Sequence, residues 1–136
     1  MSTPAIKVSS SSTFLRRVLA LDAAVTAGNG LIYLVAAEPV GRLLDVPSDL
    51  LTGLAIFLLA YGAAVGYVAA RPLPPSGWVR VVIGANLAWV AASLCALLFG
   101  WLDPSTAGTV WIPLQAAVVA GFAALQAAGL SRRERG

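Results

Sequence analysis

The chain contains no histidine, and its one cysteine is Cys95. Without histidine, haem ligation by histidine and the Ser-His-Asp and Cys-His catalytic sets are excluded, and a single thiol excludes an internal disulfide and the usual zinc ligand sets. Cys95 lies within an apolar run, where a small buried hydrophobic side chain is a simpler interpretation than a reactive thiol. We therefore expect a protein that is not an enzyme and that uses no metal and no cofactor.

Charged residues are also scarce, at 11% of the 136 residues, whereas hydrophobic residues make up 59%. A soluble domain carries about 25% charged residues, so most of this surface is expected to face lipid. The net charge of +3 does not indicate a nucleic-acid partner. The basic residues lie beside the apolar runs, where anionic lipid headgroups favour them, and the lipid bilayer is the expected partner.

Four apolar stretches are long enough to cross a membrane. They cover about residues 15–37, 50–70, 78–102 and 107–130, and each provides the roughly 20 residues that a hydrocarbon core requires. Helices are expected, because lipid offers no hydrogen-bond partner to unpaired backbone groups. The predicted fold is all-α: a polytopic membrane protein with an antiparallel bundle of four transmembrane helices over residues 14–131.

The segments outside the spans are polar. Residues 1–13 are rich in serine and predict a disordered tail, and residues 132–136 form a short basic tail. A cleaved signal peptide is an alternative for the first span, because two arginines precede it. Its length, together with Asp22 and Asn29 inside it, favours a membrane span instead.

The basic residues are distributed asymmetrically. Of the nine lysines and arginines, all but Arg42 lie before or at the start of the first span, in the connector that leads into the third span or at its start, or after the fourth span. The opposite side holds acidic residues, namely Glu38, Asp45, Asp49 and Asp103. The positive-inside rule then places both termini in the cytoplasm, with the protein crossing the plasma (inner) membrane several times.

Polar side chains also occur inside the spans, where lipid would penalise them. At a rise of about 1.5 Å per residue, Asp22, Asn86 and Gln126 each lie roughly 8 to 9 Å inward of a boundary arginine. The same estimate puts a second layer nearer the bilayer centre, made of Asn29, Tyr61 and Ser93. These residues are the candidates for binding a ligand or a proton.

Two interpretations of these groups remain open. Asparagine, glutamine and serine can simply hydrogen-bond one another and hold the helices in register, at roughly 0.6 kcal/mol per pair. Asp22 is different, because an ionisable side chain inside a membrane is a functional candidate by default. A simpler alternative is that Asp22 lies shallow enough to meet Arg80 or water.

Small residues recur at intervals of four on two spans. The second span has Gly62, Gly66 and Ala70, and the fourth has Ala116, Ala120 and Ala124. Such stripes allow close helix packing, either within the bundle or between subunits of a homo-oligomer or larger complex. We favour packing within the bundle, because helices with short connectors pack first on their neighbours.

Four segments resemble a known group of proteins. They are NGLIYL (29–34), LLDVP (43–47), NLAWVAAS (86–93) and LQAAVV (114–119). In these segments and in its layout the chain is similar to small four-helix membrane proteins of actinobacteria, broadly the DoxX-like group. The resemblance implies the fold but no particular activity.

The leading functional hypothesis concerns the polar groups. We expect a small membrane protein that binds or passes a small molecule, a proton or an ion at a cluster of Asp22, Asn86 and Gln126. The alternative is an accessory subunit whose small-residue faces dock onto a larger membrane complex.

Overall fold

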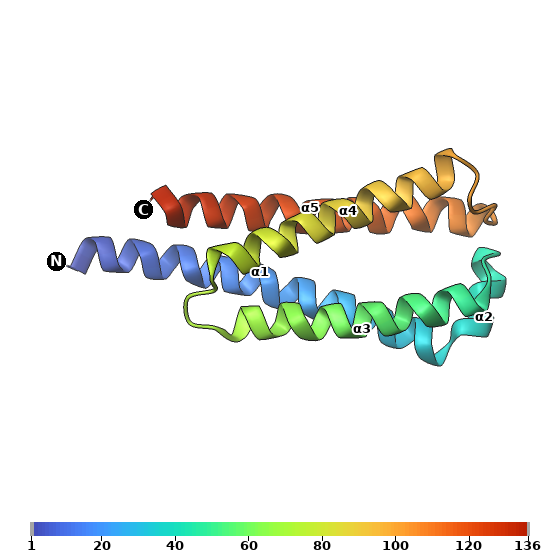
Figure 1. Ribbon diagram of the computed structural model, residues 1–136, viewed down its shortest axis with the longest axis horizontal. Helices are drawn as coiled ribbons and strands as arrows, with labels where there is room; N and C mark the ends of the chain where they lie inside the picture. Colours follow the sequence, from blue (N-terminus) through green and yellow to red (C-terminus); the bar gives the residue numbers. More distant parts are fainter. Residues whose placement is uncertain (1, 136) are drawn as a thin grey trace.

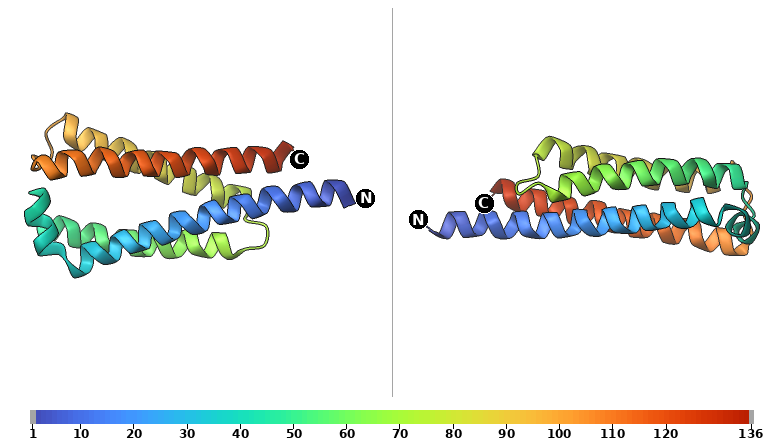
Figure 2. Two further views of the ribbon diagram at one scale, coloured as in Figure 1. Left: turned by 180° about the vertical axis from the view of Figure 1, so that it is seen from behind. Right: turned by 90° about the horizontal axis from the view of Figure 1, so that it is seen from below.

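The computed structural model describes the backbone of residues 2–135 and the side chains from residue 12 to residue 135 (Figure 1). Its elements, in chain order, are α1 (Ser2–Val35), α2 (Ala37–Leu44), α3 (Ser48–Ala70), α4 (Ser76–Leu98) and α5 (Thr106–Arg135). The first and last helical turns of the chain lie at the same end of the bundle, and α2 lies at the other (Figures 1 and 2). We call these the terminal end and the α2 end.

Four of these helices are long and apolar enough to cross a membrane. The candidate spans are Ser12–Val35, Ser48–Ala70, Ser76–Leu98 and Thr106–Arg135. In the most apolar part of any span at most 33% of the residues are buried within the protein, so apolar side chains cover the outside of the bundle. The prediction of an all-α, polytopic four-helix bundle is confirmed, and the protein is a multi-pass membrane protein.

Helix α1 begins at Ser2, within the segment for which the sequence predicts a disordered tail. Its first turns project beyond the other helices (Figure 1). Adding a turn to an existing helix gains one backbone hydrogen bond per residue, whereas starting a new helix is costly, so polar residues can continue α1. Likewise α5 runs to Arg135 through most of the predicted basic tail, and residues 1 and 136 lie outside the described part.

The connection from α1 to α3 is built around α2, which crosses the α2 end of the bundle. Asp45 ends α2 in a left-handed conformation with φ of 56°. The N–H of Val46 then donates to the carbonyl of Gly41 over 3.0 Å. A Cβ atom on Gly41 would lie 2.9 Å from the carbonyl oxygen of Val46, so this reversal requires glycine.

Helix α2 is also tied to the start of α5. The backbone N–H of Ser105 donates to the carbonyl of Leu44 over 2.9 Å, and the Ser105 hydroxyl donates to the carbonyl of Leu43 over 2.7 Å. The same hydroxyl accepts from the N–H of Gly108 and thereby caps α5. This α2–α5 tie joins the two halves of the chain at the α2 end.

The four spans form two pairs. Helix α1 packs along α3, and α4 packs along α5; α1 also contacts α5, whereas the backbones of α3 and α4 lie further apart and these two helices meet through side chains (Figure 2). The α1–α3 contact is close because of Gly62, where a Cβ atom would lie 3.0 Å from Cβ of Ala27 and 3.1 Å from its nitrogen. Gly66 faces Ala23 with more room, at 3.7 Å. These two glycines serve packing within the bundle.

The small-residue stripes are shorter than their sequence spacing suggests. Ala116 is buried and Ala120 is half-buried, but Ala70 and Ala124 are exposed on the outside of the protein. A helix turns about 100° per residue, so a position eight residues further along lies roughly 80° away from the starting face. Assigning Ala70 and Ala124 to the packing faces within the bundle is therefore wrong.

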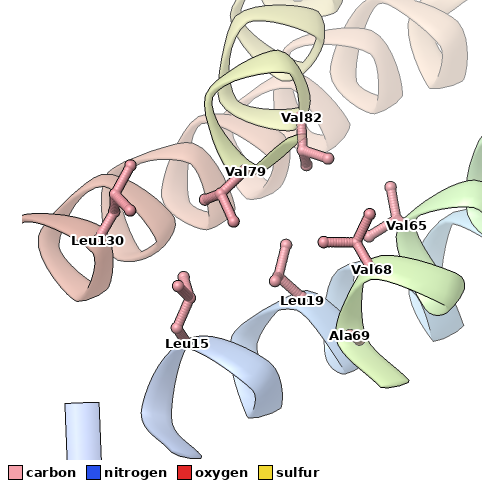
Figure 3. Packing of buried hydrophobic residues seen from close by; sticks show 8 residues of the cluster. All are labelled: Leu15, Leu19, Val65, Val68, Ala69, Val79, Val82 and Leu130. Atoms are coloured by element: carbon pink, nitrogen blue, oxygen red, sulfur yellow. The ribbon is translucent and has the colours of Figure 1, made fainter. Parts of the chain in front are cut away.

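The terminal end of the bundle is closed by an apolar core to which all four spans contribute (Figure 3). Its residues are Leu15, Leu19, Val65, Val68, Ala69, Val79, Val82 and Leu130. The buried members of a second apolar cluster, Tyr33, Leu51, Ala55 and Leu58, come from α1 and α3, and Trp89 of α4 packs against it while partly exposed. The two helix pairs thus pack tightly at the terminal end and more loosely toward α2.

Candidate functional site

A buried group of polar side chains, which we call the polar cluster, joins all four spans. Its members are Asp22 and Thr26 on α1, Tyr61 on α3, Asn86 on α4 and Gln126 on α5. Asp22, Asn86 and Gln126 are 1%, 3% and 0% exposed. The three residues that the sequence places at one depth therefore meet in one cluster.

Asp22 is the acceptor at its centre. Its Oδ2 atom accepts from Nδ2 of Asn86 over 2.9 Å and from Nε2 of Gln126 over 2.7 Å. Its Oδ1 atom accepts from the Thr26 hydroxyl over 3.1 Å. Asp22 thus receives three hydrogen bonds from neutral groups, and its two carboxyl oxygens can accept about four.

The remaining hydrogen bonds of the polar cluster join its other side chains to the two amides that contact Asp22. Nδ2 of Asn86 also donates to Oε1 of Gln126 over 3.1 Å. The Tyr61 hydroxyl lies 3.0 Å from Oδ1 of Asn86 and 3.1 Å from the carbonyl oxygen of Val82, and its single hydrogen is shared between these two acceptors. Every side-chain amide in the cluster is therefore oriented by its neighbours, and Tyr61 connects the carboxylate to the face of α3.

Asp22 has no cationic partner among the described side chains. Arg80 pairs with Glu134 instead, and both of these side chains are substantially exposed at the terminal end. The apolar core lies between that end and the polar cluster. The alternative in which Asp22 meets Arg80 or surface water is therefore wrong.

The second predicted layer, of Asn29, Tyr61 and Ser93, does not form. Tyr61 belongs to the polar cluster. Ser93 accepts from Nε2 of Gln115 over 3.1 Å, and Oε1 of Gln115 accepts from the indole N–H of Trp89 over 2.6 Å. Asn29 lies about two turns beyond Asp22 on α1 and lines a cavity between the α1–α2 segment and α5, and among the described residues it makes no hydrogen bond to Tyr61 or Ser93.

Tyr33 and Trp111 form a further link that the sequence did not reveal. The indole N–H of Trp111 donates to the Tyr33 hydroxyl over 2.7 Å and joins α1 to α5. Tyr33 shares a helical face with Asp22 at a spacing of eleven residues, which is the one sequence signal for it.

Two cavities lie where α3 and α4 separate. The first, of about 320 Å³, contacts the polar cluster at Thr26, Tyr61 and Asn86, and we call it the cluster cavity. The second, of about 360 Å³, extends toward the α2 end, and we call it the tryptophan cavity because Trp89, Trp101 and Trp111 line it. Trp89 and Ala92 line both, so the two cavities adjoin.

A third cavity, of about 540 Å³, lies between the α1–α2 segment and α5. It is lined by Asn29 and by Tyr33 and Trp111, which also line the tryptophan cavity. The Tyr33–Trp111 hydrogen bond therefore stands between the two spaces.

Aromatic rings line the opening between α3 and α4. Phe57 stacks nearly parallel to Tyr61 at a centroid distance of 5.8 Å and to Trp89 at 6.1 Å. Phe57 is half-exposed. The opening between these helices is thus bordered by flat apolar surfaces, with the polar cluster at its inner wall.

Within the described residues there is no group of histidine, cysteine, aspartate and glutamate side chains that could hold a metal ion. No family model, no curated protein and no solved structure matches the chain. The structure therefore describes a multi-pass membrane protein with a buried aspartate, Asp22, beside apolar cavities between α3 and α4.

Proposed function

We propose that the protein binds a lipophilic small molecule that enters from the bilayer between α3 and α4 and lies against Tyr61 and Asn86. The observation that carries this proposal is the separation of α3 from α4 over two adjoining apolar cavities, one of which reaches the polar cluster. Ligand pockets typically combine such apolar walls with a few oriented polar groups.

The surroundings of the cavities support entry from lipid. Phe57 and Leu50 are exposed on α3 and Leu87 is exposed on α4, so the bilayer covers both sides of the opening. A lipophilic molecule need not cross water to arrive. Tyr61 and Asn86 then supply the polar contact that distinguishes a bound molecule from an acyl chain.

The packing argues against a path for ions along the bundle axis. Such a path would have to cross the apolar core, in which Leu15, Leu19 and Val79 are fully buried. An ion in that region would lack the polar partners that desolvation demands. Binding from the side of the bundle is favoured over conduction along it.

We further propose the plasma membrane as the location, with both termini in the cytoplasm. The support is the charge distribution: arginines flank the spans at the terminal end, and Arg42 is the one basic residue at the α2 end. In this orientation the cavities would lie in the outer half of the membrane. The polar cluster would lie nearer to the cytoplasm.

Blocking the cavities tests the binding proposal. Ala92 lines both cavities, so Ala92→Trp should fill the space they share. Ala91→Trp is the matched control, since Ala91 is exposed on the same helix and lines neither cavity. Proteins purified from native membranes would be extracted with organic solvent and the extracts compared by mass spectrometry. A lipophile retained by the native protein and by Ala91→Trp, but lost from Ala92→Trp, supports the proposal; identical extracts from all three contradict it.

A further inference from the structure

Three tryptophans line the tryptophan cavity, and the indole N–H groups of two of them are already paired. The indole N–H of Trp89 is taken by Gln115, and that of Trp111 is taken by Tyr33. Trp101 lies at the exposed edge of the cavity, beside Phe99 at a centroid distance of 6.0 Å. The face of an indole ring carries negative charge density and attracts cations more strongly than any other aromatic side chain.

Three exposed aspartates at the α2 end are neighbours in the chain of residues that line the tryptophan cavity. Leu44, Leu50 and Leu102 line it. Each is next in the chain to an exposed carboxylate, in the order Asp45, Asp49 and Asp103. The one ion pair among the described side chains joins Arg80 to Glu134 at the terminal end, so none of the three carboxylates is paired with a basic side chain.

The far wall of the adjoining space is linked to a further acidic side chain, Asp22. Thr26 and Asn86 line the cluster cavity, and both donate to Asp22, which has no cationic partner. Acidic side chains therefore occur near a space that is lined by three tryptophans. The indole rings favour a cation over an anion in this space.

We propose that the ligand is a lipophilic organic cation held with its charged centre among Trp89, Trp101 and Trp111. This inference rests on the proposed function and names the class of molecule bound there. Volumes of about 360 and 320 Å³ suit a charged centre that carries a few rings or short alkyl groups. A permanently charged phosphonium or quaternary ammonium ion fits as well as an amine, because the walls supply attraction without a hydrogen bond.

Three probes of similar shape and different charge test the ligand class: tetraphenylphosphonium, tetraphenylborate and neutral triphenylphosphine oxide. Binding to the full chain in lipid nanodiscs would be measured by equilibrium dialysis, with empty nanodiscs subtracted. We expect tetraphenylphosphonium to bind about tenfold more tightly than the neutral probe, and tetraphenylborate to bind more weakly than either.

Two variants locate the effect. Trp101→Leu and Asp103→Asn should each weaken binding of the phosphonium about three- to tenfold and leave the neutral probe unchanged. Both side chains are exposed, so neither change should disturb folding. Trp78→Leu is the control, because Trp78 is an exposed tryptophan at the terminal end that lines neither cavity.

The outcomes separate this inference from the proposed function. If all three probes bind alike and Ala92→Trp abolishes their binding, the cavities take lipophiles without regard to charge, and the cation inference is overturned alone. If no probe binds above the empty-nanodisc level, the cation inference is overturned as well. The proposed function is tested separately, by the lipophiles that the purified protein retains.

Discussion

Nδ2 of Asn86 lies 2.9 Å from Oδ2 of Asp22, although 64 residues separate the two in the chain. The bond joins the α1–α3 pair to the α4–α5 pair, because Asp22 belongs to α1 and Asn86 to α4. The same carboxylate holds Gln126 of α5. One ionisable side chain thus connects three helices just above the apolar core.

Removing this acceptor should destabilise the bundle. In Asp22→Leu the amides of Asn86 and Gln126 lose their shared acceptor while remaining buried, and an unsatisfied buried donor costs about 1 to 3 kcal/mol. Asp22→Asn should be milder, because its amide oxygen can still accept both bonds and its NH₂ group can face the Thr26 hydroxyl. The free energy of unfolding in mixed micelles measures the difference. Equal stability of the two variants would show that the hydrogen bonds to Asp22 contribute little.

The sequence predicted this part of the site because depth along a helix follows from counting residues. Asp22, Asn86 and Gln126 stand at similar distances from boundary arginines, and the structure joins them. Depth alone failed for Asn29 and Ser93, since their contacts depend on helix rotation and on which helices are neighbours. The separation of α3 from α4, and hence both cavities, depends on the packing of whole helices, and a short connector between them suggested contact instead.

The close approach of α1 and α3 should make Gly62 sensitive to any added atom. Its Cβ position lies 3.0 Å from Cβ of Ala27 and 3.1 Å from the Ala27 nitrogen, so Gly62→Ala forces the helices apart. We expect a loss of about 1 to 3 kcal/mol, the usual cost of overpacking. Thermal unfolding of the purified protein would show it as a lower midpoint.

Gly84 provides the matched control for Gly62. It lies in the middle of α4 with nothing within 4 Å of its Cβ position. Gly84→Ala should leave stability unchanged or raise it by a few tenths of a kcal/mol, because alanine favours the helix. A Gly62→Ala protein as stable as Gly84→Ala would contradict the close α1–α3 packing.

The orientation of the protein in the membrane can be tested with reporter fusions. Arginines at the terminal end and carboxylates at the α2 end predict that a reporter at the C-terminus reports cytoplasm. A reporter inserted between α2 and α3, next to Val46, should report the exterior. A C-terminal reporter that is active outside the membrane would overturn the proposed orientation.

The Ser105 hydroxyl supplies one of the two hydrogen bonds of the α2–α5 tie, and the backbone N–H of Ser105 supplies the other. This hydroxyl donates to the carbonyl of Leu43 and accepts from the N–H of Gly108, so Ser105→Ala removes both a helix cap and an interhelical bond. Loss of a helix cap costs about 0.5 to 2 kcal/mol, and we expect faster amide exchange in α2 and in the first turn of α5. Thr106→Ala is the control, because Thr106 is exposed and follows the cap. Hydrogen exchange by mass spectrometry compares the two variants. If exchange in α2 is the same in Ser105→Ala and in Thr106→Ala, then the Ser105 hydroxyl does not hold α2 in place, and the backbone bond to Leu44 and the contacts with α3 are sufficient.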